Sequence, residues 1–144
     1  MFIKDIRDKI ELIKRCTKLR LTGFFLIGYP GETESEILET INFAKFLNLD
    51  KASFTFVMPL HGTDLEDIYK KKKEGAINWE NFFYYRIVEG LSDIPMERLA
   101  RLHKKAILEF YLRPKIIFGL LGELKTLSQI KIITQRAISI FCKK

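Results

Sequence analysis

Residues 21–33, LTGFFLIGYPGET, pass from a strand pattern to a helix start within one short segment. Residues 21–27 form a nearly continuous apolar run, which is typical of a strand buried on both faces. The run ends at Gly28-Tyr29-Pro30-Gly31, residue types that favour a tight turn. The segment therefore predicts a buried strand that is closed by a glycine turn.

A helix is expected directly after this turn. Thr33 precedes Glu36 by the spacing of a capping box, in which the hydroxyl and the carboxylate each accept a backbone amide. Ile37, Ile41 and Ala44 follow at helical spacing. These residues predict a helix that runs to about Leu47.

The same order of elements is then repeated. Ala52 to Met58 (ASFTFVM) reads as a second apolar strand, and a turn follows at Pro59-Leu60-His61-Gly62. Thr63 and Glu66 have capping-box spacing and predict a short helix to about Lys73. Because a helix joins the two strands, we expect them to be parallel.

Helices are predicted on both sides of this unit. Before it, isoleucines at helical spacing indicate an amphipathic helix from about Lys4 to Leu19. After it, residues 78–94 are aromatic and irregular, and a helix is expected over about 95–112, ended or kinked at Pro114. A last helix is expected to reach about Phe141.

These patterns predict an α/β protein in two parts. Residues 1–75 hold helix, strand, helix, strand and helix, and residues 76–144 hold an aromatic linker and a helical tail. Two parallel strands by themselves leave sheet edges and apolar surface exposed. We therefore expect part of a barrel or of a doubly wound sheet, with the remaining strands elsewhere.

Composition narrows the function classes. The 144 residues are 47% hydrophobic and 30% charged with a net charge of +7, as in a globular protein that could meet an anionic partner. Cys16 and Cys142 lie far apart and form no C-x-x-C or zinc pattern, so a reducing cytoplasmic setting is expected. With His61 and His103 well separated, a zinc site is not expected. No apolar run reaches membrane-span length.

The glycine turn is the candidate binding site. Ligands of α/β proteins collect at the carboxyl ends of parallel strands, and a helix amino terminus there could attract an anion. Taken alone, however, tight-turn geometry explains Gly28 and Gly31 without any ligand, and this structural interpretation is the preferred one.

Residues 23–65, from GFFLIGYPGET to MPLHGTDL, resemble the fifth strand, fifth helix and sixth strand of the radical S-adenosylmethionine (SAM) barrel. The resemblance implies that Leu26, Gly28 and Gly31 lie against the adenine of SAM. It also implies that Phe56 or Val57 lines the same pocket. The resemblance thus predicts a partial, TIM-type barrel.

The later part of the chain is similar to the tail of cobalamin-binding radical SAM enzymes. The similarity rests on Trp79, Phe82, residues 91–117 and, most specifically, the run FYLRP at 110–114. It implies cobalamin as a further cofactor. It also implies a partner that supplies the missing amino-terminal barrel half or a cobalamin domain, as part of the same gene product or as a separate chain.

The cluster motif of this family is absent from the sequence. Radical SAM chemistry needs a C-x-x-x-C-x-x-C loop whose thiolates hold a [4Fe–4S] cluster, and neither cysteine here can supply it. We therefore expect a carboxy-terminal fragment of an enzyme, inactive alone, acting on a small-molecule or lipid substrate. The alternative is a non-catalytic module that docks on a partner chain or an anionic membrane surface. Nucleic-acid binding is not expected because no recognised motif supports it.

Overall fold

The computed structural model describes residues 3–72, 78, 82–83, 86–87 and 91–121. The chain divides into two compact units, Met1–Phe110 and Tyr111–Lys144. The first holds α1 (Ile3–Cys16), β1 (Thr22–Ile27), α2 (Glu34–Phe46), β2 (Lys51–Phe56), α3 (Asp64–Lys72), β3 (Phe82–Phe83), β4 (Arg86–Ile87) and most of α4 (Met96–Tyr111). The boundary expected near residue 75 falls outside the described residues.

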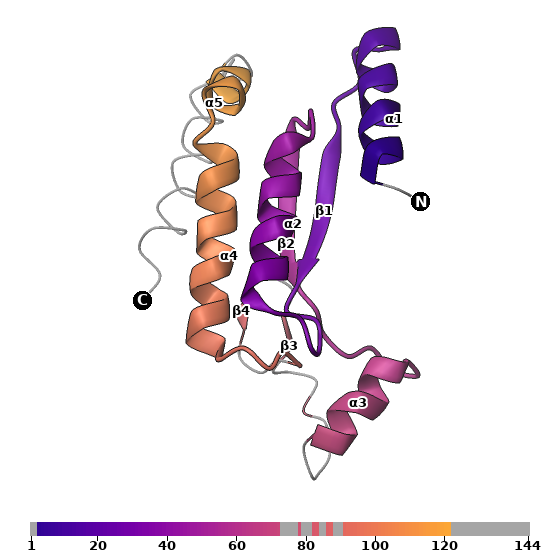
Figure 1. Cartoon of the computed structure of the whole chain (residues 1–144), viewed down its shortest axis with the longest axis vertical. Coiled ribbons are helices and arrows are strands. Elements are labelled where there is room, and N and C mark those ends of the chain that lie inside the picture. Colours follow the sequence, from indigo (N-terminus) through magenta and orange to yellow (C-terminus); the bar gives the residue numbers. More distant parts are fainter. Residues whose placement is uncertain (1–2, 73–77, 79–81, 84–85, 88–90, 122–144) are drawn as a thin grey trace. The chain divides into compact units, whose positions relative to one another are not determined.

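β1 and β2 form a parallel pair, as the sequence predicts. The register places Phe25 beside Phe54 and Leu26 beside Thr55. Together with the linking helix α2 they form an α/β unit of the kind that a partial barrel contains (Figure 1). The predicted fold class is therefore confirmed.

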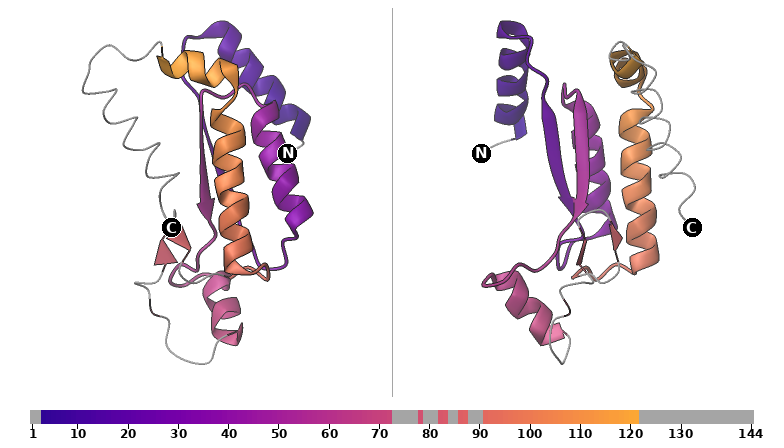
Figure 2. Two further views of the ribbon diagram at one scale, coloured as in Figure 1. Left: turned by 90° about the vertical axis from the view of Figure 1, so that its left-hand side faces the viewer. Right: turned by 180° about the vertical axis from the view of Figure 1, so that it is seen from behind.

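One face of this sheet carries the core. Ile27, Phe54 and Phe56 are buried on it, and the Phe25 and Phe54 rings stack with their centroids 5.2 Å apart. Figures 1 and 2 show α2 and α4 running alongside the two strands. The buried residues Ile37, Ile41 and Ala44 of α2 and Leu99, Leu102, Ala106 and Phe110 of α4 complete this core.

The other face of β1 is open, so the prediction of a strand buried on both faces is wrong for the described residues. Phe24 is 76% exposed and Leu26 is 61% exposed, whereas Ile27 is fully buried. The reason is the alternation of side chains along a strand, since the helices cover only one face. The apolar run 21–27 thus contains side chains that the described residues leave uncovered.

The outer edge of β1 is also open. Leu21 and Ile27 carbonyls accept from the β2 side, so the backbone groups of Thr22, Phe24 and Leu26 point away from β2. Among the described residues no strand pairs with this edge.

α4 covers the corresponding edge of β2. The Nε2 of His103 lies 2.9 Å from the carbonyl oxygen of Phe54, and the His103 ring packs 4.6 Å from that of Phe56. Burial lowers the pKa of His103, so the neutral ring with its proton on Nε2 is favoured. This hydrogen bond satisfies a carbonyl that β1 cannot reach.

Two of the helix starts differ in how they are capped. At α2 the predicted capping box is confirmed, with the Thr33 hydroxyl accepting from the Glu36 amide and the Glu36 carboxylate accepting from the Thr33 amide. At α3 the predicted box is wrong. There the Thr63 hydroxyl donates to the Leu60 carbonyl, and the Glu66 carboxylate accepts from the Gly62 amide, because the turn presents that amide instead.

The later segments contain structure that the sequence reading leaves out. β3 and β4 pair antiparallel, although residues 78–94 read as irregular. α4 ends at Tyr111, close to the expected end, and α5 (Pro114–Leu121) begins in the second unit at Pro114. The last predicted helix, to about Phe141, lies outside the described residues.

Candidate functional site at the glycine turn

The turn after β1 requires glycine at two positions. Gly28 has φ +83° and Gly31 has φ +81°, a region that residues with side chains rarely adopt. A Cβ on Gly28 would also lie 2.8 Å from Cδ2 of Leu99, whereas one on Gly31 would meet no atom within 4 Å. Gly28 is thus fixed by conformation and packing, and Gly31 by conformation alone.

Carboxylates accept hydrogen bonds from the backbone amides of this turn. The Glu32 carboxylate accepts from the Gly28 amide at 2.6 Å and from the Tyr29 amide at 3.1 Å. The Asp93 carboxylate accepts from the Gly31 amide at 2.8 Å. Three turn amides therefore already have anionic acceptors.

The start of α2, beside the turn, is equally acidic. Glu36 serves in the capping box, and hydrogen bonds from the backbone and hydroxyl of Thr33 lower its pKa. Glu34 forms a two-pronged ion pair with Arg98 of α4, at 2.8 and 2.7 Å, and this partner lowers the pKa of Glu34. Both carboxylates are therefore ionised at neutral pH.

This arrangement does not suit an anion. A phosphate needs unoccupied N–H donors, and here the amides of Gly28, Tyr29, Gly31 and Thr33 are bound to carboxylates that would repel it. The notion that the α2 amino terminus attracts an anion is therefore not supported. A neutral or cationic ligand fits the turn better.

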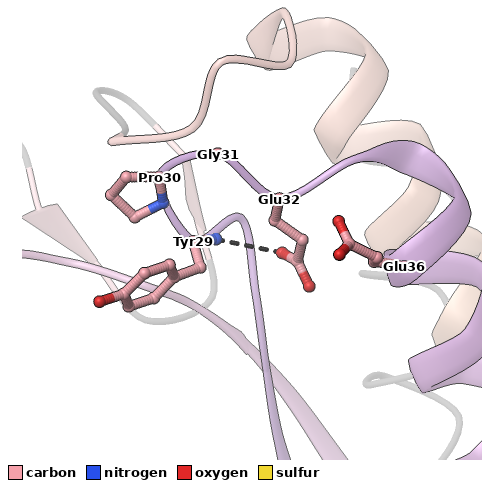
Figure 3. Close-up of a pocket in the computed structure, with 5 residues that line it drawn as sticks. All are labelled: Tyr29, Pro30, Gly31, Glu32 and Glu36. Atoms are coloured by element: carbon pink, nitrogen blue, oxygen red, sulfur yellow. Dashed lines mark hydrogen bonds between the residues drawn. The ribbon is translucent and has the colours of Figure 1, made fainter.

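The surface around the turn is hollowed only slightly. Tyr29, Pro30, Gly31, Glu32 and Glu36 line an open depression of about 290 Å³. Figure 3 shows the Glu32 carboxylate bonded to the Tyr29 amide, with the Tyr29 ring directed away from it. The depression by itself is too open to enclose a small molecule, so a complete pocket needs further walls.

The structure separates the predicted site residues by face. Leu26 precedes the glycine turn on the open face of β1. By alternation Val57 belongs to the same face, where it is buried against Tyr69 and Leu91. Phe56 lies on the helix-covered face against His103. Contact of any of the five with a cofactor stays a prediction.

Sequence reasoning missed the carboxylates that hold the turn. Glu32 lies four residues after Gly28, a spacing that a turn could have suggested. Asp93 lies 62 residues after Gly31, and no local pattern connects them.

The described residues offer no cluster or metal site. No group of three His, Cys, Asp or Glu side chains gathers among them in a way that could hold a metal ion. Cys16 is exposed at the end of α1 and stands apart from the turn. The residues present therefore do not fit a [4Fe–4S] cluster, which needs several thiolates.

Within the described segments, none of the helices combines the length and the apolar character that crossing a membrane would require.

Comparison with known proteins places the chain near a class of group-transfer enzymes. No family model matches it. Its sequence is nevertheless similar, over much of its length, to parts of a methyltransferase and of several methylthiotransferases.

Three relatives illustrate this similarity. An uncharacterized methyltransferase of Pyrococcus horikoshii is 36% identical over 114 residues, 77% of this chain. The tRNA-2-methylthio-N(6)-dimethylallyladenosine synthase of Buchnera aphidicola is 29% identical over 70% of this chain. The ribosomal protein uS12 methylthiotransferase RimO of Legionella pneumophila is 30% identical over 58% of it.

The matched regions are small parts of these relatives. They amount to 25% of the first two proteins and 19% of the third. The chain thus spans about a quarter or less of the length of these curated relatives.

Proposed function

We propose that this chain is the carboxy-terminal part of a radical SAM enzyme and supplies the wall of the site that contacts the adenosyl group of SAM. The observation that carries the proposal is the glycine turn after β1, whose amides are taken by carboxylates and which follows the exposed apolar side chain of Leu26. The similarity to a methyltransferase and to methylthiotransferases supports it.

The chemistry of the turn fits SAM better than a nucleotide phosphate. SAM carries a neutral, planar adenine and a cationic sulfonium, and acidic surroundings disfavour phosphate but not these groups. In this proposal Leu26 lies against the adenine, Gly28 and Gly31 let the backbone approach it, and Val57 closes the same face. Phe56 supports the strand end from the helix side.

The cluster belongs to another part of the enzyme. When bound to a [4Fe–4S] cluster, SAM supplies a 5′-deoxyadenosyl radical after reductive cleavage. The described residues hold no ligands for that cluster, so their contribution is to bind and orient SAM.

The partner is the missing half of the barrel. The outer backbone groups of β1 and the exposed Phe24 and Leu26 present an edge and an apolar face that a neighbouring parallel strand would cover. The part of each relative outside the matched region leaves ample length for such strands. By the names of these relatives, the whole enzyme transfers a methyl or methylthio group. Cobalamin stays a prediction from the resemblance of the tail.

The non-catalytic alternative, docking on an anionic membrane or partner, is less well supported. The apolar stripe of α4 is buried in the first unit, so it does not present itself to a membrane. Of the basic side chains, Arg98 is paired with Glu34, and Lys105 lies 3.7 Å from Glu109.

A matched pair of leucine variants tests the proposal. Leu26 and Leu12 are equally exposed, at 61%, but Leu12 lies on α1 away from the turn. In a longer polypeptide or complex that supplies the cluster motif, Leu26→Asp should weaken SAM binding by about tenfold or more, because an apolar contact is lost and a charge must be desolvated. Leu12→Asp should leave the Kd unchanged, as should His61→Ala. Equal SAM affinity in Leu26→Asp and the unmodified protein would remove this strand from the site.

A further inference from the structure

Asp93 connects three segments that are distant in the sequence. One of its carboxylate oxygens accepts from the Gly31 amide at 2.8 Å, and the other accepts from Lys72 of α3 at 2.6 Å. The Lys72 ammonium also donates to the carbonyl of Leu91 at 2.9 Å. The glycine turn, the end of α3 and the segment before α4 therefore meet at one carboxylate.

The segment that carries Asp93 is fixed on both sides. Leu91 is fully buried in the cluster with Val57 and Tyr69, and Leu99 is buried in α4. Between them the Ser92 hydroxyl accepts from the Ile94 amide at 3.1 Å. The carboxylate is thus presented to the turn from an anchored backbone.

Stability alone does not account for this contact. Asp93 and Lys72 have side chains that are 59% and 38% exposed, and exposed ion pairs contribute little to folding. The specific effect of Asp93 is on the geometry of the turn. Its hydrogen bond fixes the direction of the Gly31 amide, and Gly31 has the left-handed backbone conformation. The hydrogen bond from Lys72, followed by that from the Gly31 amide, lowers the pKa of Asp93, so the acceptor is charged at neutral pH.

We infer that Asp93 is a positioning residue, which holds the glycine turn in the conformation that receives the adenosyl group of SAM. The inference rests on the proposed function for its ligand, but the anchoring of the turn can be measured without SAM. Asp93 acts through Gly31 and is not itself proposed to touch the cofactor.

The experiment must distinguish the effect of Asp93 from the effects of other charged groups near the turn. Glu32 holds the Gly28 and Tyr29 amides, Glu36 caps α2, and Glu34 pairs with Arg98. The Glu34–Arg98 pair joins the start of α2 to α4, whereas Asp93 joins the glycine turn, α3 and the segment before α4, and the pair does not involve the Gly31 amide. Arg98→Gln is therefore the matched control, since it removes a link of similar kind and exposure.

The first measurement is amide hydrogen exchange and the proton chemical shift of Gly31 by NMR on the 144-residue chain at neutral pH. In Asp93→Ala the Gly31 amide should exchange about tenfold faster and move upfield, as expected when a hydrogen bond to a charged acceptor is lost. Asp93→Asn should restore part of the protection, because its amide oxygen still accepts. Arg98→Gln should match the unmodified chain. An unchanged Gly31 amide in Asp93→Ala, or an equal loss in Arg98→Gln, would overturn the inference.

The second measurement is the Kd for SAM in the completed polypeptide or complex. Asp93→Ala should weaken binding several-fold, Asp93→Asn less, and Arg98→Gln not at all. Unchanged SAM affinity in Asp93→Ala after loss of the Gly31 bond would overturn the positioning role. If the unmodified complex binds no SAM, the proposed function fails, while the NMR result still decides whether Asp93 holds the turn.

Discussion

Gly28 and Gly31 share a conformation but not an environment. Both have φ near +80°, yet only Gly28 stands against a packed side chain, Leu99 of α4. The two positions therefore separate the cost of the backbone conformation from the cost of crowding.

Alanine at each position should destabilise the chain by different amounts. Gly31→Ala should lower the free energy of unfolding by about 1 kcal/mol, the cost of a left-handed conformation for a residue with a Cβ. Gly28→Ala should lower it by about 2 kcal/mol or more, because the new methyl group also meets Leu99 at 2.8 Å. Urea titration with an unchanged m-value measures both. Equal effects at the two glycines would show that the Leu99 contact is relieved without cost.

Among the secondary-structure elements, α4 contributes polar contacts as well as apolar packing. It lies along the edge of β2, where His103 binds the Phe54 carbonyl, and Glu109 forms an ion pair with Lys45 of α2. On the other side, Asp50 accepts from the Leu21 amide at 2.7 Å and pairs with Lys14 of α1. Polar contacts therefore tie α4 to β2 and to α2, and tie α1 to the residues that directly precede β1 and β2.

The buried His103 makes stability depend on pH. Its pKa is lowered in the folded chain, chiefly by burial, while in the unfolded chain it is about 6.5. Below that value the unfolded state binds a proton that the folded state resists, so stability should fall as the pH drops from about 7 towards 5. Urea midpoints across this range measure the effect.

His103→Gln is the control for this dependence. A glutamine amide can still donate to the Phe54 carbonyl but does not titrate. The variant should lose most of the slope between pH 7 and 5, even if it is less stable throughout. A slope equal to that of the unmodified chain would assign the dependence to another group.

The element pattern was predictable because it is local. The α2 capping box and the end of α4 before Pro114 follow from residues within a turn or two of one another, and the parallel pairing follows from the helix that joins two apolar runs. The α3 cap was mispredicted because Thr63 and Glu66 have the right spacing, but the adjacent Gly62 offers its amide first. The two-residue strands β3 and β4 are too short to produce a period in the sequence.

The site was only partly predictable, because the sequence shows local patterns but not contacts between distant residues. Gly28 and Gly31 predict a turn, but the Asp93 carboxylate that binds the Gly31 amide lies 62 residues further along the chain. The exposure of one face of β1 was not predicted, because an apolar run does not show which of its side chains other elements will bury. Phe24 and Leu26 are exposed here, although their neighbours Phe25 and Ile27 pack against the core.

The first unit as a whole is an α/β layer in which helices cover only one face of the sheet. Helices cover one face and the β2 edge, whereas the other face and the outer edge of β1 lie open among the described residues. Relatives that are about four or more times longer than the matched region are consistent with a larger protein around this layer. We therefore expect this layer to bind SAM only as part of that larger protein.

The decisive experiment is anaerobic reconstitution with iron and sulfide, followed by measurement of cluster content and of 5′-deoxyadenosine formed from SAM. The isolated 144-residue chain, with Cys16 and Cys142 as its only cysteines, should bind no stoichiometric [4Fe–4S] cluster and form no 5′-deoxyadenosine. Joined to a polypeptide that carries the three-cysteine motif and the remaining strands, it should support reductive cleavage of SAM. A stoichiometric cluster with SAM cleavage in the isolated chain, or no SAM binding in the completed protein, would contradict the account.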